Sequence, residues 1–563
     1  MCGIAGEYCL EAPTDTVYRI LQMQKHRGPD TLGLLQFDSI AIGANRLSIS
    51  GSNFAPSPMM AEHSDIILAY NGEIYGLSIK ENQSDTGWLL RYLENNPLSV
   101  PDLNGMFSMC WVDVKKKKLA VARDFFGIKP LYIWKSPQRF QFSSEIFPLV
   151  RVNELHPVLD ELACLEYIGL GTRVGSDTLF SNIERLEPGN ILYVEQKKNE
   201  LHYKLRCPQK HRLYRDTIKK DLLQAIKESV LLCADTNRPL GVFLSSGVDS
   251  MAIVYILAEA GIDNLHTFSL ILDNDGIENL EQLSLPGLAW RKWKHTPITV
   301  TDADVWDLFH RFLDITSQPC FPPSAAYTLL LSKVAAENGV KVVLSGEGSD
   351  ELFGGYDSYI SFLRTDNPDP CNFYLNNSVF RTALNLFTDS GEYYIEMLRR
   401  KMSSVYEGKK PLSMQLLALE RKLSLQPLLE RIDHASMYFS IEVRTPFLHG
   451  DVPIIAWNVL GEFDPALGTK PYLRRALRPL LHDWANVPKR PLRISLDSWF
   501  QGERLRSAVD YIISDPYLTI VNKKKWEQFV NRLLNHPNTS ELMVAIRMYQ
   551  LLSYLNRIKG DSK

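Results

Sequence analysis

The cysteine at position 2 is the first residue of this chain whose position suggests chemistry. Removal of the initiator methionine, which a small second residue allows, would make Cys2 the terminal residue. Its thiol would then lie beside a free α-amine with a pKa of about 8, which can act as a base within the same residue. A cysteine at this position is usually a packed or exposed thiol. The motifs that follow it, described below, favour a nucleophile instead.

A loop of small polar residues gives a second chemical signal. It follows the apolar run LGVFL, precedes the helix-like segment MAIVYILAEAG, and consists of Ser245, Ser246, Gly247, Val248, Asp249 and Ser250. A strand, a small-residue loop and a helix N-terminus in this order direct backbone N–H groups and the positive end of a helix dipole at one anion. The natural ligand is a phosphate, and Asp249 would repel it unless a divalent cation such as Mg²⁺ lay between them. A cluster that only caps the helix is the simpler alternative.

A second loop of the same kind argues against that alternative. The run VKVVL leads into SGEGSDELFGGY, which contains Ser345, Gly346, Glu347 and Asp350. Ligands of open α/β sheets bind at the carboxyl ends of the strands. We therefore expect Asp249 and Asp350 to share magnesium across a triphosphate. Together, the two loops predict an ATP site.

The elements that must hold these groups differ between two halves of the chain. Up to about residue 150, short segments with period-two alternation and polar turns predict a strand-rich layered domain. After a passage rich in Pro and Gly, the runs GVFL, HTFSLIL and VKVVL alternate with helical stretches, which is typical of parallel strands in an α/β sheet. From about residue 376 the pattern is mostly helical. We place the domains at 2–150 and 211–563, with a connecting segment at 151–210.

Composition narrows the classes of function. The chain has 563 residues, of which 45% are hydrophobic and 23% charged, so sizeable cores can form. Sixty-two Lys and Arg against 65 Asp and Glu leave a net charge of −3, which provides no field for nucleic acid or an anionic membrane. The sequence contains no apolar span of membrane length and no export signal, so we expect a cytoplasmic protein. Eight scattered cysteines predict neither a disulfide framework nor a structural zinc site.

Several further motifs run collinearly along nearly the whole chain. They are MCGIAG, HRGPD at 26–30, RLSI at 46–49, NGEIY at 71–75, SDT at 84–86, LNGMFSMCWVD, ARDFFGIKPLY, FSSE, the two loops and IEVRTPFL at 441–448. In these motifs the chain resembles the glutamine-dependent asparagine synthetases. The resemblance implies an N-terminal α+β domain of the N-terminal nucleophile hydrolase type, with layered antiparallel sheets and helices. It implies a C-terminal α/β domain of the adenine-nucleotide hydrolase-like type, with a parallel sheet, ATP-pyrophosphatase chemistry and a helical C-terminal part.

For the first domain, the resemblance implies a glutaminase. Cys2 would attack the side-chain amide of glutamine and release ammonia, while Asn71 and the backbone N–H of Gly72 would form the oxyanion hole. An arginine would hold the α-carboxylate of glutamine and two acids its α-ammonium, because opposite charges suit opposite ends of the substrate. The residues implied to bind glutamine are Arg46, Asn71, Gly72, Glu73 and Asp85.

For the second domain, the resemblance implies formation of an acyl-adenylate. An acceptor carboxylate would attack the α-phosphate of ATP and release pyrophosphate, and ammonia would then displace AMP. Glu347 would position the acceptor or the ammonia, and Lys489 would stabilise the charge that develops. Asp249 and Asp350 would hold Mg²⁺. The residues implied to bind ATP are Phe243, Ser245, Ser246, Gly247, Val248, Asp249, Ser250, Leu270, Ser345 and Gly346, with Phe243 and Leu270 beside the adenine.

The chain departs from the family pattern in four places, one of which is the usual acidic pair after the third strand, thinned here to Glu-Asn-Leu-Glu at 278–281. The spacing of 14 positions from Asn71 to Asp85 is shorter than usual and predicts the loss of a helix. Lys489 is followed by Arg-Pro-Leu where the family has a variable residue and Gly-Phe, which leaves the register of that lysine open. The family motif PFLD reads Pro446 to His449 here.

These departures lie mostly near the expected binding places of the acceptor and the nucleotide. They therefore weaken the identification of aspartate as the acceptor, whereas the residues expected to release ammonia from glutamine are all present. We expect glutamine, ATP and aspartate as small-molecule substrates. A different acceptor carboxylate, such as a sugar acid or a specialised metabolite, is the alternative, and a catalytically idle scaffold is a third hypothesis. We expect no nucleic-acid or membrane partner, and a homodimer is the one assembly left open.

Overall fold

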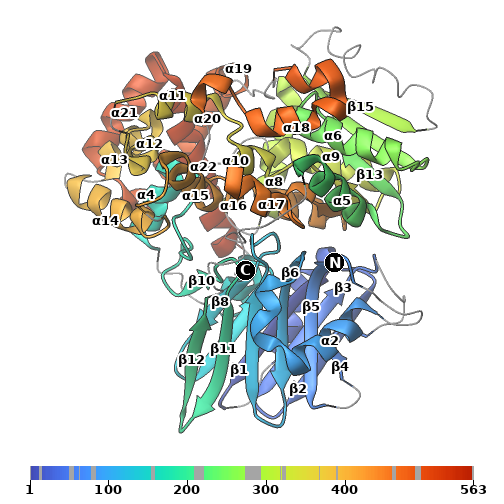
Figure 1. Cartoon of the computed structure of the whole chain (residues 1–563). Coiled ribbons are helices and arrows are strands. Elements are labelled where there is room, and N and C mark those ends of the chain that lie inside the picture. The colour runs from blue at the N-terminus through green and yellow to red at the C-terminus, as the bar shows by residue number, and fades with distance from the viewer. Residues whose placement is uncertain are drawn as a thin grey trace.

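The computed structural model describes a chain of two sheet-based halves, with the antiparallel sheets below and the parallel sheet and most helices above (Figure 1). The described residues are 2–11, 15–49, 56–61, 64–77, 84–153, 159–207, 221–272, 293–316, 319, 325–366, 368–387, 391–406, 408–459, 464–488 and 496–560. The amino end lies at the boundary between the two halves (Figure 1).

Two six-stranded antiparallel sheets form the N-terminal domain, with the orders β10-β8-β9-β1-β3-β2 and β12-β11-β7-β6-β5-β4. The strands of the first sheet are β1 (Cys2–Cys9), β2 (Thr31–Phe37), β3 (Ile40–Arg46), β8 (Tyr132–Lys135), β9 (Arg139–Ser143) and β10 (Ile183–Arg185). Those of the second sheet are β4 (Met59–Met60), β5 (Ile66–Ile74), β6 (Gly105–Asp113), β7 (Lys118–Arg123), β11 (Ile191–Lys197) and β12 (Glu200–Arg206). This arrangement confirms the expected layered strands.

The core of this domain lies between the two sheets and is covered by helices on the outer faces. Ile4 and Ile42 of the first sheet share one buried cluster with Ala69 and Val121 of the second. Helix α1 (Thr16–Met23) packs on the first sheet and α2 (Asp85–Asn95) on the second, and α3 (Ile146–Val152) lies beside α1. Each helix presents one apolar face to its sheet, as an amphipathic pattern requires. The layers are therefore helix, sheet, sheet and helix.

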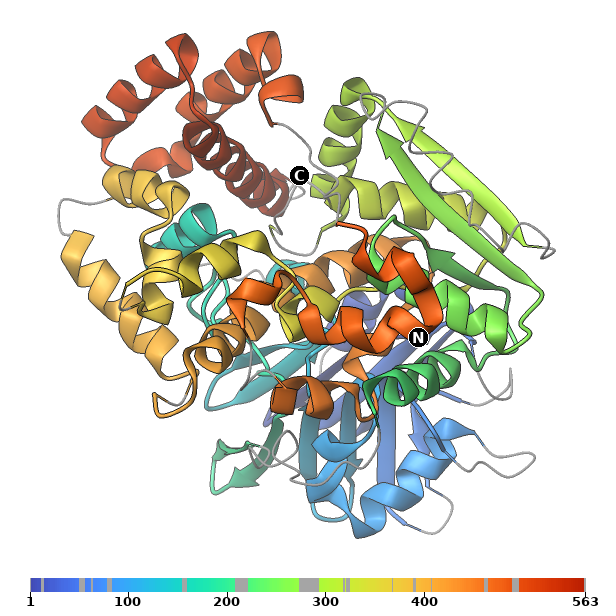
Figure 2. The same ribbon diagram turned by 45° about the horizontal axis from the view of Figure 1, so that its top comes forward.

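The segment 151–210, expected to be a connector, contributes to both halves. Its strands β10, β11 and β12 complete the two N-terminal sheets, because β10 pairs with β8 and β11 pairs with β7. Its helix α4 (Glu161–Leu170) instead packs among C-terminal helices, where its teal ribbon lies beside yellow and red helices in Figure 2. The short apolar stretches of this segment did not indicate which half they would join.

A parallel five-stranded sheet forms the centre of the C-terminal half, in the order β15-β14-β13-β16-β17. Its strands are β13 (Leu240–Phe243), β14 (Leu265–Leu272), β15 (Lys294–Val300), β16 (Val342–Leu344) and β17 (Glu442–Arg444). Val242 and Leu344 pack with α5 (Leu222–Ala234) and α6 (Val248–Glu259) on one face. Phe268 and Val343 pack with residues of α9 (Ala325–Glu337) on the other. Helices on both faces explain the continuous apolar runs of these strands.

Helices make up most of the remaining C-terminal chain, as expected. They are α8 (Asp302–Ile315), α10 (Ser349–Phe353), α11 (Asp357–Leu363), α12 (Pro370–Leu375), α13 (Ser378–Phe387), α14 (Gly391–Ser403), α15 (Leu412–Leu423), α16 (Leu425–Tyr438), α17 (Val452–Val459), α18 (Pro471–Leu481), α19 (Leu496–Trp499), α20 (Gly502–Ser514), α21 (Lys523–Asn535) and α22 (Thr539–Gly560). Across the described ranges, every helix is too short or too polar to cross a membrane. The α+β and α/β halves confirm the expected fold class.

Candidate active sites

Cys2 lies at the start of β1, opposite Arg46 at the end of β3. Its side chain is buried, and its backbone N–H donates a 3.0 Å hydrogen bond to Asn71 Oδ1 on β5. Burial raises the pKa of the Cys2 thiol, while the backbone N–H of Leu47 and the guanidinium of Arg46 oppose that rise. Three strands of two sheets therefore bring the predicted nucleophile, the predicted carboxylate clamp and the predicted oxyanion residue together.

Asn71 and Gly72 lie toward the carboxyl end of β5, where the strand pairs with β6. Asn71 Nδ2 donates only a long bond of 3.4 Å to Ser108 Oγ. At Gly72 the φ angle is +152°, and a Cβ there would lie 2.1 Å from the carbonyl oxygen of Met106. Such a contact is impossible, so position 72 admits only glycine. The close approach of β6 to β5 explains the glycine of NGEIY.

The two acids expected at the α-ammonium position lie in the same electrostatic neighbourhood. Burial is the main cause that raises the pKa of Glu73 to about 8, and the pKa of Asp85 is raised for the same reason. Arg444, on β17 of the other half, lowers the pKa of Glu73, and Asp85 raises it. Burial thus disfavours ionisation of both carboxyl groups, and their role at the α-ammonium of glutamine stays a prediction.

Ser84 fixes where Asp85 lies. The Ser84 hydroxyl accepts a 3.0 Å hydrogen bond from the Gly87 N–H and so caps α2, whose first residue is Asp85. Asp85 also accepts hydrogen bonds from Thr86, of 2.7 Å from its N–H and 3.2 Å from its hydroxyl. The serine and threonine of SDT therefore both help to hold Asp85 at the start of α2. The helix loss that the spacing between Asn71 and Asp85 predicts concerns residues 78–83, which lie outside the described residues.

The first predicted phosphate loop, residues 245–250, has the expected order of strand, loop and helix. It connects β13 to α6, which begins at Val248. Ser250 Oγ accepts a 3.0 Å bond from the Ser245 N–H, and Ser245 Oγ accepts one of 3.2 Å from the Gly247 N–H. Ser245 is exposed and Ser246 is half-buried. The hydroxyls thus hold the loop's shape while its outer surface stays open to a ligand.

The second loop lies directly beside the first because β16 is the neighbour of β13. At Gly346 a Cβ would lie 2.9 Å from the Cβ of Asp249, closer than real side chains approach. At Gly355 a Cβ would lie 1.9 Å from Asp350 Oδ1. These glycines allow the two acidic side chains to approach one point, which confirms the expected proximity of Asp249 and Asp350.

Lys470 occupies that point, and sequence reasoning did not find it. Its ammonium contacts Asp249 Oδ2 at 2.6 Å, Asp350 Oδ1 at 3.0 Å and Ser349 Oγ at 3.1 Å. It is almost completely buried and precedes α18, with a left-handed φ of +51°. The only sequence signal was Lys-Pro at a helix start, where proline is favoured. Because one cation contacts oxygens of both loops, the carboxylates fit a shared Mg²⁺, an ion that prefers such oxygen donors.

The remaining predicted nucleotide residues lie near the carboxyl edge of the sheet. Phe243 and Leu270 are half-buried, on β13 and β14, and pack against core clusters. Glu347 follows the second loop's first glycine and is bonded to Arg431 of α16. Lys489 lies outside the described residues, so its role remains a prediction.

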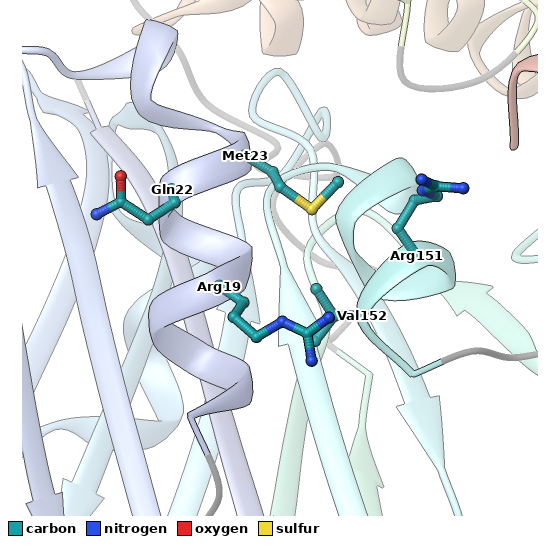
Figure 3. A pocket seen from close by; sticks show the side chains of 5 residues that line it. All are labelled: Arg19, Gln22, Met23, Arg151 and Val152. Atoms are coloured by element: carbon teal, nitrogen blue, oxygen red, sulfur yellow. The ribbon is translucent and has the colours of Figure 1, made fainter. Parts of the chain in front are cut away.

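Two cavities in the described part of the chain lie apart from these groups. One of about 340 Å³ lies beside α1 and α3, and Figure 3 shows that its five labelled side chains come from those helices: Arg19, Gln22, Met23, Arg151 and Val152. The other, of about 660 Å³, lies between the halves and is lined by Phe126, Lys401, Trp457 and their neighbours. Neither cavity is lined by a residue predicted to bind glutamine or nucleotide. The candidate sites are therefore identified by the types and positions of their side chains and not by the size of a cavity.

Comparison with known proteins also divides the chain into two domains. A family profile described as "Asparagine synthase" matches residues 221–553, and one described as "Glutamine amidotransferase domain" matches residues 1–204. The chain is 26% identical to the glutamine-hydrolyzing asparagine synthetase 2 of Bacillus subtilis, over 99% of this chain and 78% of the relative. It is 26% identical to asparagine synthetase 3 of the same organism, over 86% and 85%. It is 27% identical to asparagine synthetase B of Escherichia coli, over 63% and 65%.

Proposed function

Because this chain belongs to the asparagine synthase family, we propose that it makes asparagine from aspartate, with ATP as the activating substrate and glutamine as the nitrogen donor. Its two matched domains make it an ATP-dependent amidotransferase ligase. Aspartate as the acceptor is supported by the names of the relatives, all three of which are asparagine synthetases.

In the N-terminal domain, Cys2 is the proposed nucleophile. Burial holds its thiol neutral, so a base must remove the proton, and the α-amine of a processed Cys2 is the proposed base. The sulfur attacks the amide carbon of glutamine, the amide nitrogen leaves as ammonia, and water then hydrolyses the thioester to glutamate. Asn71 and the N–H of Gly72 are proposed to bind the oxyanion.

Recognition of the two ends of glutamine uses opposite charges. Arg46, adjacent to Cys2 across the sheet, is proposed to bind the α-carboxylate in a bidentate manner. Glu73 and Asp85 are proposed to bind the α-ammonium. Their raised pKa values support this assignment, since buried acids gain most from a cationic ligand.

In the C-terminal domain, the two loops are proposed to bind the triphosphate of ATP. The β-carboxylate of aspartate attacks the α-phosphorus, pyrophosphate leaves, and ammonia then attacks the acyl carbon and displaces AMP. Lys470 is proposed to turn from the two carboxylates to the phosphates when ATP binds. Asp249 and Asp350 would hold Mg²⁺, which would neutralise phosphate charge. Glu347 is proposed to lie near the acceptor.

The single observation that carries this proposal is the convergence of Asp249 and Asp350, from two loops, on one buried ammonium. A purified protein with a processed amino end should form equal amounts of asparagine, AMP and pyrophosphate from ATP, Mg²⁺, glutamine and aspartate. The products are measured by amino-acid analysis and nucleotide chromatography. Ammonium chloride in place of glutamine isolates the second half-reaction.

The acceptor is tested by omitting aspartate and supplying other carboxylates. Formation of AMP that is independent of aspartate but requires another acid would refute asparagine synthesis while leaving the family chemistry in place. Absence of both glutamine hydrolysis and nucleotide consumption would refute the whole proposal.

A further inference from the structure

Arg444 crosses from the nucleotide half of the chain to the glutamine pocket. It is the last residue of β17, and its side chain is completely buried. Nη2 lies 3.4 Å from Oε2 of Glu73, although the two residues are 371 positions apart in the sequence. The guanidinium also lies over the ring of Tyr75, 5.7 Å from its centroid. One acid of the predicted glutamine pocket therefore has a partner from the other domain.

The other donors of Arg444 fix the direction of its guanidinium. Nε donates a 2.5 Å bond to Glu442 Oε1. Nη1 donates to the carbonyl oxygens of Cys233 at 2.9 Å and Asp235 at 3.0 Å. A planar guanidinium with its donors engaged on three sides cannot rotate freely. Nη2 is thus held toward Glu73 by contacts that all belong to the nucleotide half.

The charges around Glu73 show what this contact does. Glu442 and Asp85 both oppose the ionisation of Glu73, and Arg444 is the cation that acts most strongly on Glu73. A carboxyl group that is neutral cannot bind an ammonium ion by charge. Removing Arg444 would make ionisation of Glu73 still less favourable and would remove the contact that orients its carboxyl group.

We propose that Arg444 is a positioning residue that orients the Glu73 carboxyl group for the α-ammonium of glutamine and favours its ionised form when that cation binds, so that the glutamine pocket is complete only when the two domains are docked. This inference rests on the proposed role of Glu73 in glutamine binding. Arg444 itself does not touch the reacting atoms.

A purely structural role, in which Arg444 only holds β17 in place, is distinguished through a contact of its main chain. Its carbonyl oxygen accepts a 2.9 Å bond from the N–H of Ser345, the first residue of the second phosphate loop. A substitution that displaced β17 would therefore disturb adenylation as well. Ammonia-dependent synthesis measures that disturbance separately from glutamine recognition.

The test compares glutamine with glutaric acid monoamide, which is glutamine without its α-amino group. In the wild type, kcat/KM for hydrolysis should strongly favour glutamine. In Arg444→Gln, whose amide retains donors for the two carbonyls, this preference should fall at least about tenfold, mainly through KM for glutamine. Hydrolysis of the monoamide and ammonia-dependent AMP formation should stay close to wild type. Arg444→Lys, which restores a cation, should recover part of the preference.

Arg547→Gln is the matched control, because Arg547 is also buried and also donates to two main-chain carbonyls, those of Ile168 and Gly169, but contacts no residue of the predicted glutamine pocket. It should leave the preference for glutamine unchanged. In a Glu73→Gln background, Arg444→Gln should cause no further loss of preference.

An unchanged preference in Arg444→Gln, or an equal loss of glutamine hydrolysis, monoamide hydrolysis and ammonia-dependent synthesis, would overturn the inference. If Arg444→Gln does not fold, Arg444→Lys decides: a reduced preference supports the inference and an unchanged one refutes it. A wild-type protein that does not prefer glutamine to the monoamide would refute the proposed role of Glu73 instead, so the two failures are distinguishable.

Discussion

At the residue scale, Cys2 combines a buried thiol with a nearby arginine and backbone donor. Burial raises the pKa of this thiol, so the reactive thiolate has to be generated by a base. A processed α-amine is such a base. The proposed mechanism uses that amine at Cys2, whereas Cys9, at the other end of β1, accepts a hydrogen bond from Arg139.

The first prediction concerns this nucleophile. Cys2→Ala should abolish glutamine hydrolysis and glutamine-dependent synthesis, because no sulfur remains to form the thioester. Synthesis from ammonium salts should persist, since the phosphate loops lie in the other domain. Ammonia release and AMP formation measure the two activities. Cys9→Ala is the control and should retain both; glutamine use by Cys2→Ala would exclude Cys2 as the nucleophile.

The second prediction concerns the pH dependence of glutamine binding. The pKa of Glu73 is raised to about 8, chiefly by burial, so below that pH the carboxyl is protonated and neutral in the empty pocket. Glutamine brings a cation that favours the ionised form. Affinity should therefore increase as pH rises toward 8, by up to about tenfold for each pH unit.

Calorimetric titration of Cys2→Ala with glutamine measures this dependence without turnover. Cys2→Ala combined with Glu73→Gln is the matched variant and should lose that part of the pH dependence. An affinity that is the same at neutral and mildly alkaline pH in both proteins would contradict the assignment of Glu73.

At the scale of elements, the parallel order of β13 and β16 brings the two loops together. Because these strands are neighbours and run in the same direction, their carboxyl ends lie side by side. Helix α18 comes from a later part of the chain, and its first residue follows Lys470 directly. Two strand ends and one helix start thus converge at the proposed nucleotide site. The buried ammonium compensates two acids that would otherwise repel each other.

The third prediction tests this compensation. Lys470→Met should reduce AMP formation by roughly a hundredfold or more with either glutamine or ammonia as the nitrogen source, because it removes a preorganised charge from the nucleotide site. Glutamine hydrolysis should be much less affected. Pyrophosphate release measures the first step. Arg475→Met is the control, because Arg475 is an exposed cation on α18, the helix that Lys470 precedes. An equal loss of AMP formation in both variants would indicate a general effect of charge.

At the scale of the whole molecule, α16 joins the two halves through buried charges. Asp433 contacts Arg27 Nη2 at 2.7 Å and Lys129 Nζ at 3.2 Å, and both cations come from the N-terminal domain. Burial acts to raise the pKa of Asp433, but Arg27 and Lys129 outweigh it and hold that pKa below its usual range. The same helix carries Arg431, which bonds to Glu347 of the second phosphate loop. The domain boundary and the nucleotide site therefore share one helix.

The fourth prediction concerns the stability of this boundary. Asp433→Asn would remove the acid that Lys129 contacts and one of the two acids that Arg27 contacts, and breaking a buried pair in this way costs about 3–5 kcal/mol. Urea unfolding monitored by fluorescence should show that loss of stability. Folding lowers the pKa of Asp433, so this carboxylate stabilises the wild-type fold at pH values above its pKa in the unfolded chain. That stabilisation is lost as the pH falls through its pKa in the folded protein.

Asp113→Asn is the matched control, since Asp113 pairs with an exposed lysine at 2.7 Å and its loss should leave unfolding unchanged. Equal stability of the Asp433 and Asp113 variants would contradict a structural role for the buried cluster.

The motifs of the sequence determined which chemical groups would be present and, to a large extent, which local elements carry them. Period-two alternation predicted β3, β5, β6 and β7, and continuous apolar runs predicted the parallel strands β13, β14 and β16. These predictions succeeded because strand patterning is a local property of the side chains. The loops followed, since a small-residue turn between strand and helix has few possible geometries.

The tertiary structure alone decided which distant residues complete each site. Lys470 meets Asp249 across 221 positions, and Arg444 meets Glu73 across 371. Strands β10 to β12 joined sheets whose other strands lie earlier in the chain. A local pattern contains no information about such partners, because they are selected by the packing and burial of the whole fold, where an unpaired charge is too costly to remain.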